Sequence, residues 1–197
     1  MKRKLFFIAV IVICLSLTAY GTLAYFTADG TAHNVITTGD VDIVLIDSIK
    51  DGKQEQDGWS LSGVMPGQQV EKHVAVDNTG SGAAWIRVKL TVTITDANGE
   101  PLDTQIQGKD KVVNVVSYSL DTDSWQEKGG YIYYLQPVPA GKATVSLFEK
   151  DIVEFAKEMG NEYQGCHVSI LVEAEAVQSA NNGDSALTAT GWPKSGT

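Results

Sequence analysis

The chain has 197 residues, a formal net charge of −9 at pH 7 and 43% hydrophobic residues. An acidic balance of this size argues against binding of nucleic acid or anionic lipid through bulk charge, and it favours solubility. The length fits one domain with a sizeable core.

The N-terminal 24 residues have the parts of a secretory signal peptide. Residues 2–4 are basic, residues 5–20 carry no charge, and Thr22-Leu23-Ala24 is a small-x-small cleavage site. Residues 5–24 are also long enough, at ~1.5 Å per residue, to cross the roughly 30 Å core of a membrane. We therefore expect a secreted or cell-surface protein, and an uncleaved segment that anchors the chain in the membrane remains the alternative.

Alternation of apolar and polar residues predicts β-strands in the rest of the chain. Every other residue is apolar over residues 86–95, and a period of two is typical of a strand with one buried face. Residues 73–77 and 168–176 alternate in the same way. Further β-rich runs are residues 41–46, 112–120, 131–135 and 143–148. Turn-forming Gly, Pro, Asn and Asp separate these runs.

Helix is expected at only two places. Residues 151–159 can form two turns that end at Gly160, and residues 184–190 can form one or two more before Gly191. About eight short strands with regular turns favour an all-β fold. We predict an antiparallel jelly-roll-like β-sandwich with one or two short helices.

The residues that usually carry catalysis or bind metals form no recognisable motif. The histidines His33, His73 and His167 are widely separated, without HExxH or helical i,i+4 spacing. Residues 121–124 resemble the start of a calcium loop, but the glycine and the acidic residue that complete such a loop are missing. Because Cys14 lies in the apolar N-terminal run, Cys166 alone remains after export and no intramolecular disulfide is expected. We predict no catalytic residue, no metal ligand and no cofactor.

Aromatic residues offer one candidate binding surface, a strip for carbohydrate. Its members are Trp59, Trp85, Trp125, Tyr131, Tyr133 and Tyr134. Cross-strand pairs and core packing in a β-sandwich use the same residue types. We prefer that structural interpretation to the strip.

Several segments resemble, in order, the motifs of one family. Residues 21–27 (GTLAYFT) are similar to the Ala-Tyr or Ala-Phe junction of exported matrix proteins that a SipW-type signal peptidase processes. The other similar stretches are Asn34, residues 37–39, residues 41–43, 65–72 (MPGQQVEK), 76–80, 85–89, 130–134, 139–144, 147–148 and 173–178 (EAEAVQ). Over nearly its whole length the chain resembles the TasA/camelysin family of biofilm-matrix fibre proteins of Gram-positive bacteria.

The resemblance implies a cleavage between Ala24 and Tyr25 and assembly into fibres. In such fibres the freed N-terminal strand inserts into the sheet of the neighbouring subunit, which is β-strand addition. The strand-donor residues of this chain would be Tyr25, Phe26, Thr27, Val35, Ile36 and Thr37. The implied partners are further copies of the chain in a homopolymer and the signal peptidase, with an accessory protein at the fibre base as a further candidate.

These expectations divide the chain into four parts. They are a signal peptide (1–24), an N-terminal donor strand segment (25–40), a β-sandwich domain (41–192) and a tail (193–197). Two other functions stay open. Part of the family carries a metallo-endopeptidase label, which no metal motif supports here, and a membrane-tethered binding module would use the aromatic strip.

Overall fold

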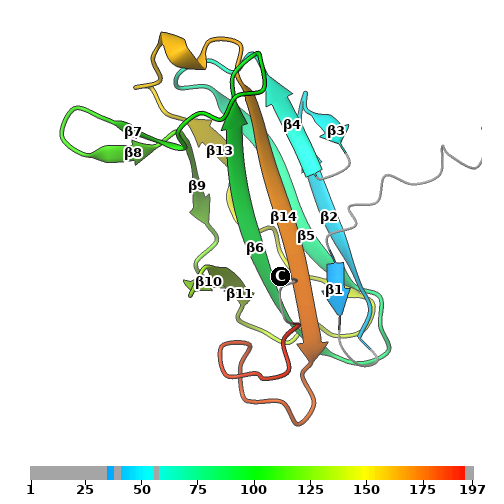
Figure 1. Cartoon of the computed structure of the whole chain (residues 1–197). Helices are drawn as coiled ribbons and strands as arrows, with labels where there is room; N and C mark the ends of the chain where they lie inside the picture. The colour runs from blue at the N-terminus through cyan, green and yellow to red at the C-terminus, as the bar shows by residue number, and fades with distance from the viewer. Residues whose placement is uncertain (1–34, 38–40, 56–57, 194–197) are drawn as a thin grey trace, which may run out of the picture. The chain divides into compact units, whose positions relative to one another are not determined.

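The computed structural model describes residues 35–37, 41–55 and 58–193 (Figure 1). Its regular structure is almost entirely β-strand. Within the described residues, no helix is long and apolar enough to cross a membrane. The predicted cleavage site at Ala24 and Tyr25, the donor residues Phe26 and Thr27, and His33 lie outside the described residues.

The first sheet is built around β14, the last strand of the described residues. β14 (His167–Gln178) pairs along its whole length with β6 (Ala84–Thr95) in antiparallel register. Beyond β6 lie β11 (Tyr131–Tyr134) and β10 (Trp125–Lys128). On the other side of β14 lie β4 (Gly58–Ser62), then β3 (Lys53–Glu55), and also β1 (Val35–Thr37).

The second sheet is built around β5 (Gln69–Asn78). Its other members are β2 (Ile43–Ile49), β12 (Lys142–Ala143), β13 (Phe148–Phe155) and β9 (Val116–Leu120). A separate hairpin of β7 (Gln105–Gln107) and β8 (Val112–Asn114) projects beyond the end of β9 (Figure 1).

Alternating residues of the two sheets meet in one core. Val74 and Val76 of β5 and Ile86 and Val88 of β6 are all fully buried and belong to one hydrophobic cluster. Cys166 is buried in the same cluster as a free thiol. The prediction of an antiparallel β-sandwich is confirmed.

The predicted helix over residues 151–159 is wrong. The chain continues as β13 to Phe155 because Val153 and Phe155 alternate into the core, where both are fully buried. β13 pairs there with β5 on one side and β9 on the other. A 3-10 turn, η1 (Asn161–Tyr163), follows it.

After β14 the chain folds back against the outer face of the first sheet. Trp85 and Val177 form a small cluster there with Ala186, and Ala189 and Trp192 pack against it. Only one helical turn forms in the region predicted as helix at residues 184–190, where the backbone N–H of Ala189 donates to the Ser185 carbonyl at 3.0 Å. Pro193, which follows Trp192, is also buried.

Candidate functional site

The edge of β14 that faces away from β6 is shared by two short strands. β4 pairs with it from His167 to Ile170, and β1 pairs with it from Ala174 to Ala176. The β1 pairing is parallel, whereas the other strand pairings of the described residues are antiparallel. Three of the predicted strand-donor residues therefore lie in a strand, and that strand is added to a sheet of the same chain.

Two of the three residues of β14 that pair with β1 are small and face the core. Ala174 and Ala176 are fully buried, and they stand in register with Val35 and Thr37 of β1. Parallel pairing is slightly less stable per residue than antiparallel pairing, and three residues supply few hydrogen bonds. β1 is thus a short, weakly held addition to an otherwise well-packed sheet.

A buried ion pair fixes the register of β14 beside β1. Glu175 stands between Ile36 of β1 and Arg87 of β6. The Arg87 Nε–H donates to the Glu175 carboxylate at 2.7 Å, and the two side chains are 10% and 5% exposed. The guanidinium carbon lies 3.7 Å from the ring centre of Tyr131 and 4.5 Å from that of Trp192. Charge-assisted and cation–π contacts of this kind hold β6 and β14 in one alignment.

A second buried ion pair lies between β2 and β5. Lys72 Nζ is 2.5 Å from Asp47 Oδ1, and the side chains are 0% and 2% exposed. Burial raises the pKa of the Asp47 carboxyl and lowers the pKa of Lys72, and each shift is opposed by the other charge. The Trp59 indole N–H donates to the Asp47 carbonyl at 3.0 Å, which ties β4 of the first sheet to β2 of the second.

The two histidines of the described residues, His73 and His167, lie in different sheets. His73 lies on β5, with Nδ1 3.1 Å from Asp151 Oδ1, and the Ser146 hydroxyl donates to the same carboxylate. His167 begins β14 in the other sheet. No group of three or more His, Cys, Asp or Glu in the described part of the chain is arranged to hold a metal ion. Asp121, at the start of the calcium-like sequence, accepts the Asp123 N–H in a turn.

The six aromatic residues of the predicted strip do not share one surface. Trp125 and Tyr134 pack edge to face inside the sandwich, with ring centres 4.9 Å apart. Tyr131 and Tyr133 lie on the outer face of the first sheet, where Trp192 packs edge to face against Tyr133 with ring centres 5.9 Å apart. Sequence reasoning missed Trp192, because its contacts depend on the fold-back of the segment after β14.

Comparison with known proteins adds no assignment: no protein-family model, no curated protein and no solved structure matches this chain.

Proposed function

We propose that this chain is a secreted structural subunit of an extracellular biofilm-matrix fibre, and that each copy donates its N-terminal strand to the next. The observation that carries the proposal is the parallel pairing of β1 with β14. The resemblance of residues 21–27 and of the later segments to the TasA/camelysin family points in the same direction.

The place that β1 occupies suits exchange between copies. A neighbour's β1 would make the same register with β14 as the chain's own strand, so exchange loses no hydrogen bond. β14 without β1 would leave backbone groups at Ala174 to Ala176 unpaired at a sheet edge, which favours pairing with another strand. A contact that joins the start of one copy to the sheet of the next does not close on itself, and it therefore builds filaments.

Mixed cysteine variants test the exchange directly. Thr37 and Ala176 are register partners, so a Thr37→Cys chain and an Ala176→Cys chain can form a disulfide only if β1 crosses between them. We expect a covalent dimer in the mixture after unfolding and co-refolding, and multimers when one chain carries both changes. Val35→Cys mixed with Ala176→Cys is the matched control, because Val35 pairs with Ala174.

Two results would count against the proposal. One is a double variant that forms only an internal disulfide while the mixture stays monomeric. The other is equal filament formation by a chain that starts at Tyr25 and by one that starts near Gly39, since the second lacks β1.

A further inference from the structure

β9 is an edge strand of the second sheet with unused backbone groups. Val116 stands in register with Phe155 of β13, whose N–H donates instead to the Gln68 carbonyl at 2.9 Å, so Val116 and Phe155 form a pair without mutual hydrogen bonds. Because the direction of backbone groups alternates along an antiparallel strand, Val116, Tyr118 and Leu120 direct their N–H and C=O groups away from β13. Among the described residues, no strand pairs with that side of β9.

β9 also lacks the features that usually protect an edge. Its sequence is Val-Ser-Tyr-Ser-Leu, without charge, Pro or Gly. At the edges of the first sheet, β10 contains Glu127 and Lys128 and β3 contains Lys53 and Glu55. Charged side chains and very short strands discourage pairing with another chain. β9 is therefore better suited to accept an added strand than β10 or β3.

The sequence of β9 is nearly the same read in either direction from Tyr118. If a second β9 pairs with it in antiparallel register centred on Tyr118, Ser117 faces Ser119 and Val116 faces Leu120 of the other copy. The outward backbone groups then form about six hydrogen bonds, two for each facing pair. Exposed Ser117 and Ser119 would pair on the outer face, and Val116, which is buried, would continue the inner face.

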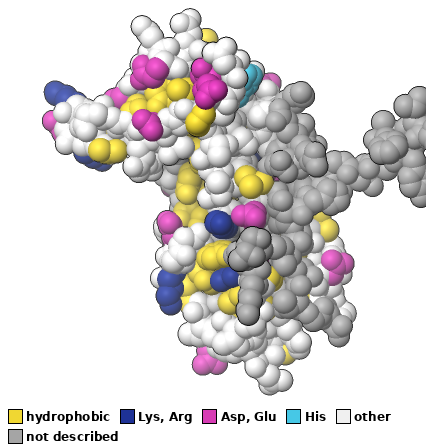
Figure 2. All heavy atoms as spheres, viewed as in Figure 1, with side chains coloured by type: hydrophobic (Ala, Val, Ile, Leu, Met, Phe, Trp, Pro, Cys, Tyr) yellow, Lys and Arg dark blue, Asp and Glu magenta, His cyan; other side chains and the backbone are white. Residues whose placement is uncertain are grey.

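Charges at the two ends of β9 fit the same arrangement. The hairpin before β9 carries exposed Lys109 and Lys111 around Asp110, and the turn after β9 carries Asp121 and Asp123. Figure 2 shows charged side chains on the projecting hairpin. An antiparallel pair brings the hairpin of one copy beside the acidic turn of the other, so opposite charges meet at both ends.

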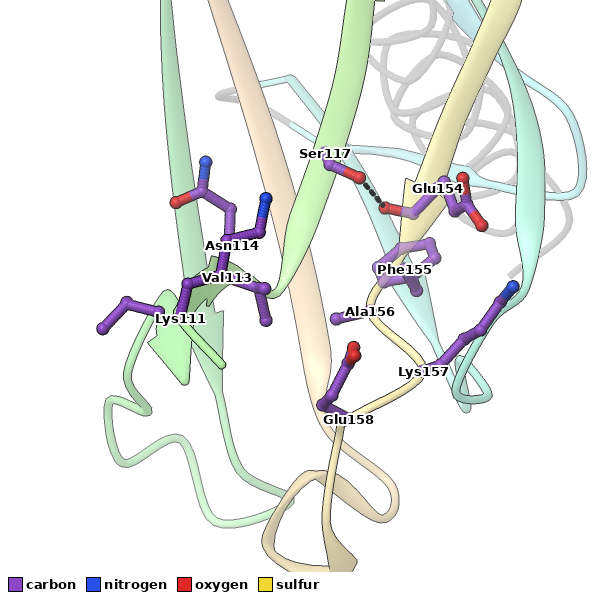
Figure 3. A pocket seen from close by; sticks show the side chains of 10 residues that line it. Lys111, Val113, Asn114, Ser117, Glu154, Phe155, Ala156, Lys157 and Glu158 are labelled. Carbon is purple, nitrogen blue, oxygen red and sulfur yellow. Dashed lines mark hydrogen bonds between the residues drawn. The ribbon is translucent and has the colours of Figure 1, made fainter. Parts of the chain in front are cut away.

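A depression at the hairpin end of β9 can receive that turn. It has a volume of about 390 Å³, and Lys111, Asn114, Ser117 and Glu154 are among its lining residues (Figure 3). Lys111 would meet an acidic residue there. We propose that β9 pairs with β9 of a second copy about a two-fold axis at Tyr118, which joins two second sheets into one continuous sheet.

This inference does not depend on strand donation, because it uses a different edge and a two-fold rather than a head-to-tail contact. Where both contacts form, β9 pairing joins two filaments side by side.

Crosslinking between variants with one added cysteine each tests the register. The protein is made as Ser117→Cys and as Ser119→Cys, and each variant is oxidised alone and in a mixture of the two. Residue 117 faces residue 119 of the other copy, so the mixture is expected to give covalent dimers, and each variant alone is not, because like positions lie diagonally. Cys166 is buried and serves as the internal background. Dimers from either variant alone in equal yield, or none in the mixture, would overturn the proposal.

A charge variant tests the same edge without a covalent bond. Ser117→Lys with Ser119→Lys places lysines opposite each other in the pair, and both serines are exposed in the single copy. The matched control is Ser48→Lys with Thr93→Lys, at exposed strand positions away from β9. With the donor strand blocked by Ile36→Pro in all chains, light scattering should show dimers for the control and monomers for the β9 variant. Equal masses for the two would refute β9 pairing.

Discussion

Removal of Asp47 should destabilise the fold far more than removal of a surface partner. In Asp47→Ala the Lys72 ammonium stays at a site where its side chain is 0% exposed, without the carboxylate at 2.5 Å. Breaking a buried ion pair from one side costs about 3–5 kcal/mol. For a domain of this size the midpoint of thermal unfolding should fall by roughly 6–20 °C. The matched control is Glu71→Ala, whose pair with Lys50 is 65% and 61% exposed and is worth about 0–1 kcal/mol.

A double-mutant cycle compares Asp47→Ala, Lys72→Met and the double variant that carries both changes, each measured by urea unfolding. The double variant should be more stable than either single variant, because it leaves no unpaired buried charge. The reasoning is refuted if Asp47→Ala costs no more than Glu71→Ala, or if the costs of the two single changes simply add.

The stabilities of Lys72→Met and of Asp47→Ala should also change in opposite directions as the pH rises. Burial raises the pKa of Asp47, so in Lys72→Met stability is retained at low pH and lost as the pH rises through the folded-state pKa of Asp47. Burial lowers the pKa of Lys72, so Asp47→Ala is weakest at low pH and gains stability as the pH rises through the folded-state pKa of Lys72. Unfolding midpoints measured across pH check both slopes, and slopes of the same sign would contradict the assignment.

Three further outcomes follow from buried contacts. Asn78→Ala should lower the free energy of unfolding by roughly 2–4 kcal/mol, because the Asn78 amide donates to two carbonyls at 2.8 Å that would lose their partner; urea unfolding measures this. Trp192→Ala should cost about 1–2 kcal/mol through the lost stacking on Arg87, and Trp192→Phe should cost less; equal losses would contradict that contact. Burial raises the pKa of Cys166, so its thiol should react with a disulfide reagent slowly in the folded chain and quickly in urea.

The local alternation of apolar and polar residues predicted the long strands. The secondary structure after Asp151 depends instead on pairing with strands that are distant in the sequence. The alternation at residues 86–95 and 168–176 appears as β6 and β14, because one face of each is buried. The apolar spacing after Asp151 fitted a helix, but pairing with two neighbouring strands and burial of Phe155 overrode it.

The candidate site was predictable only in part. The resemblance singled out Val35, Ile36 and Thr37 as strand-donor residues; these three residues form β1, and donation to another copy stays a prediction. Their parallel register with β14 depends on contacts between the two ends of the sequence, which no local pattern specifies. The sequence pattern also did not predict that Glu175 and Arg87 are buried. Alternation places both side chains on a polar face of the strands, and the segment after β14 covers that face only in the fold.

The position of β14 has a consequence for how the molecule is made. β14 follows β1, β4 and β6 in the sequence, yet all three pair with it. A ribosome releases residues from the N-terminus onwards, so β1, β4 and β6 lack this shared partner until residues 167–178 have emerged. A product cut short before His167 therefore lacks the strand that joins those three strands in one sheet.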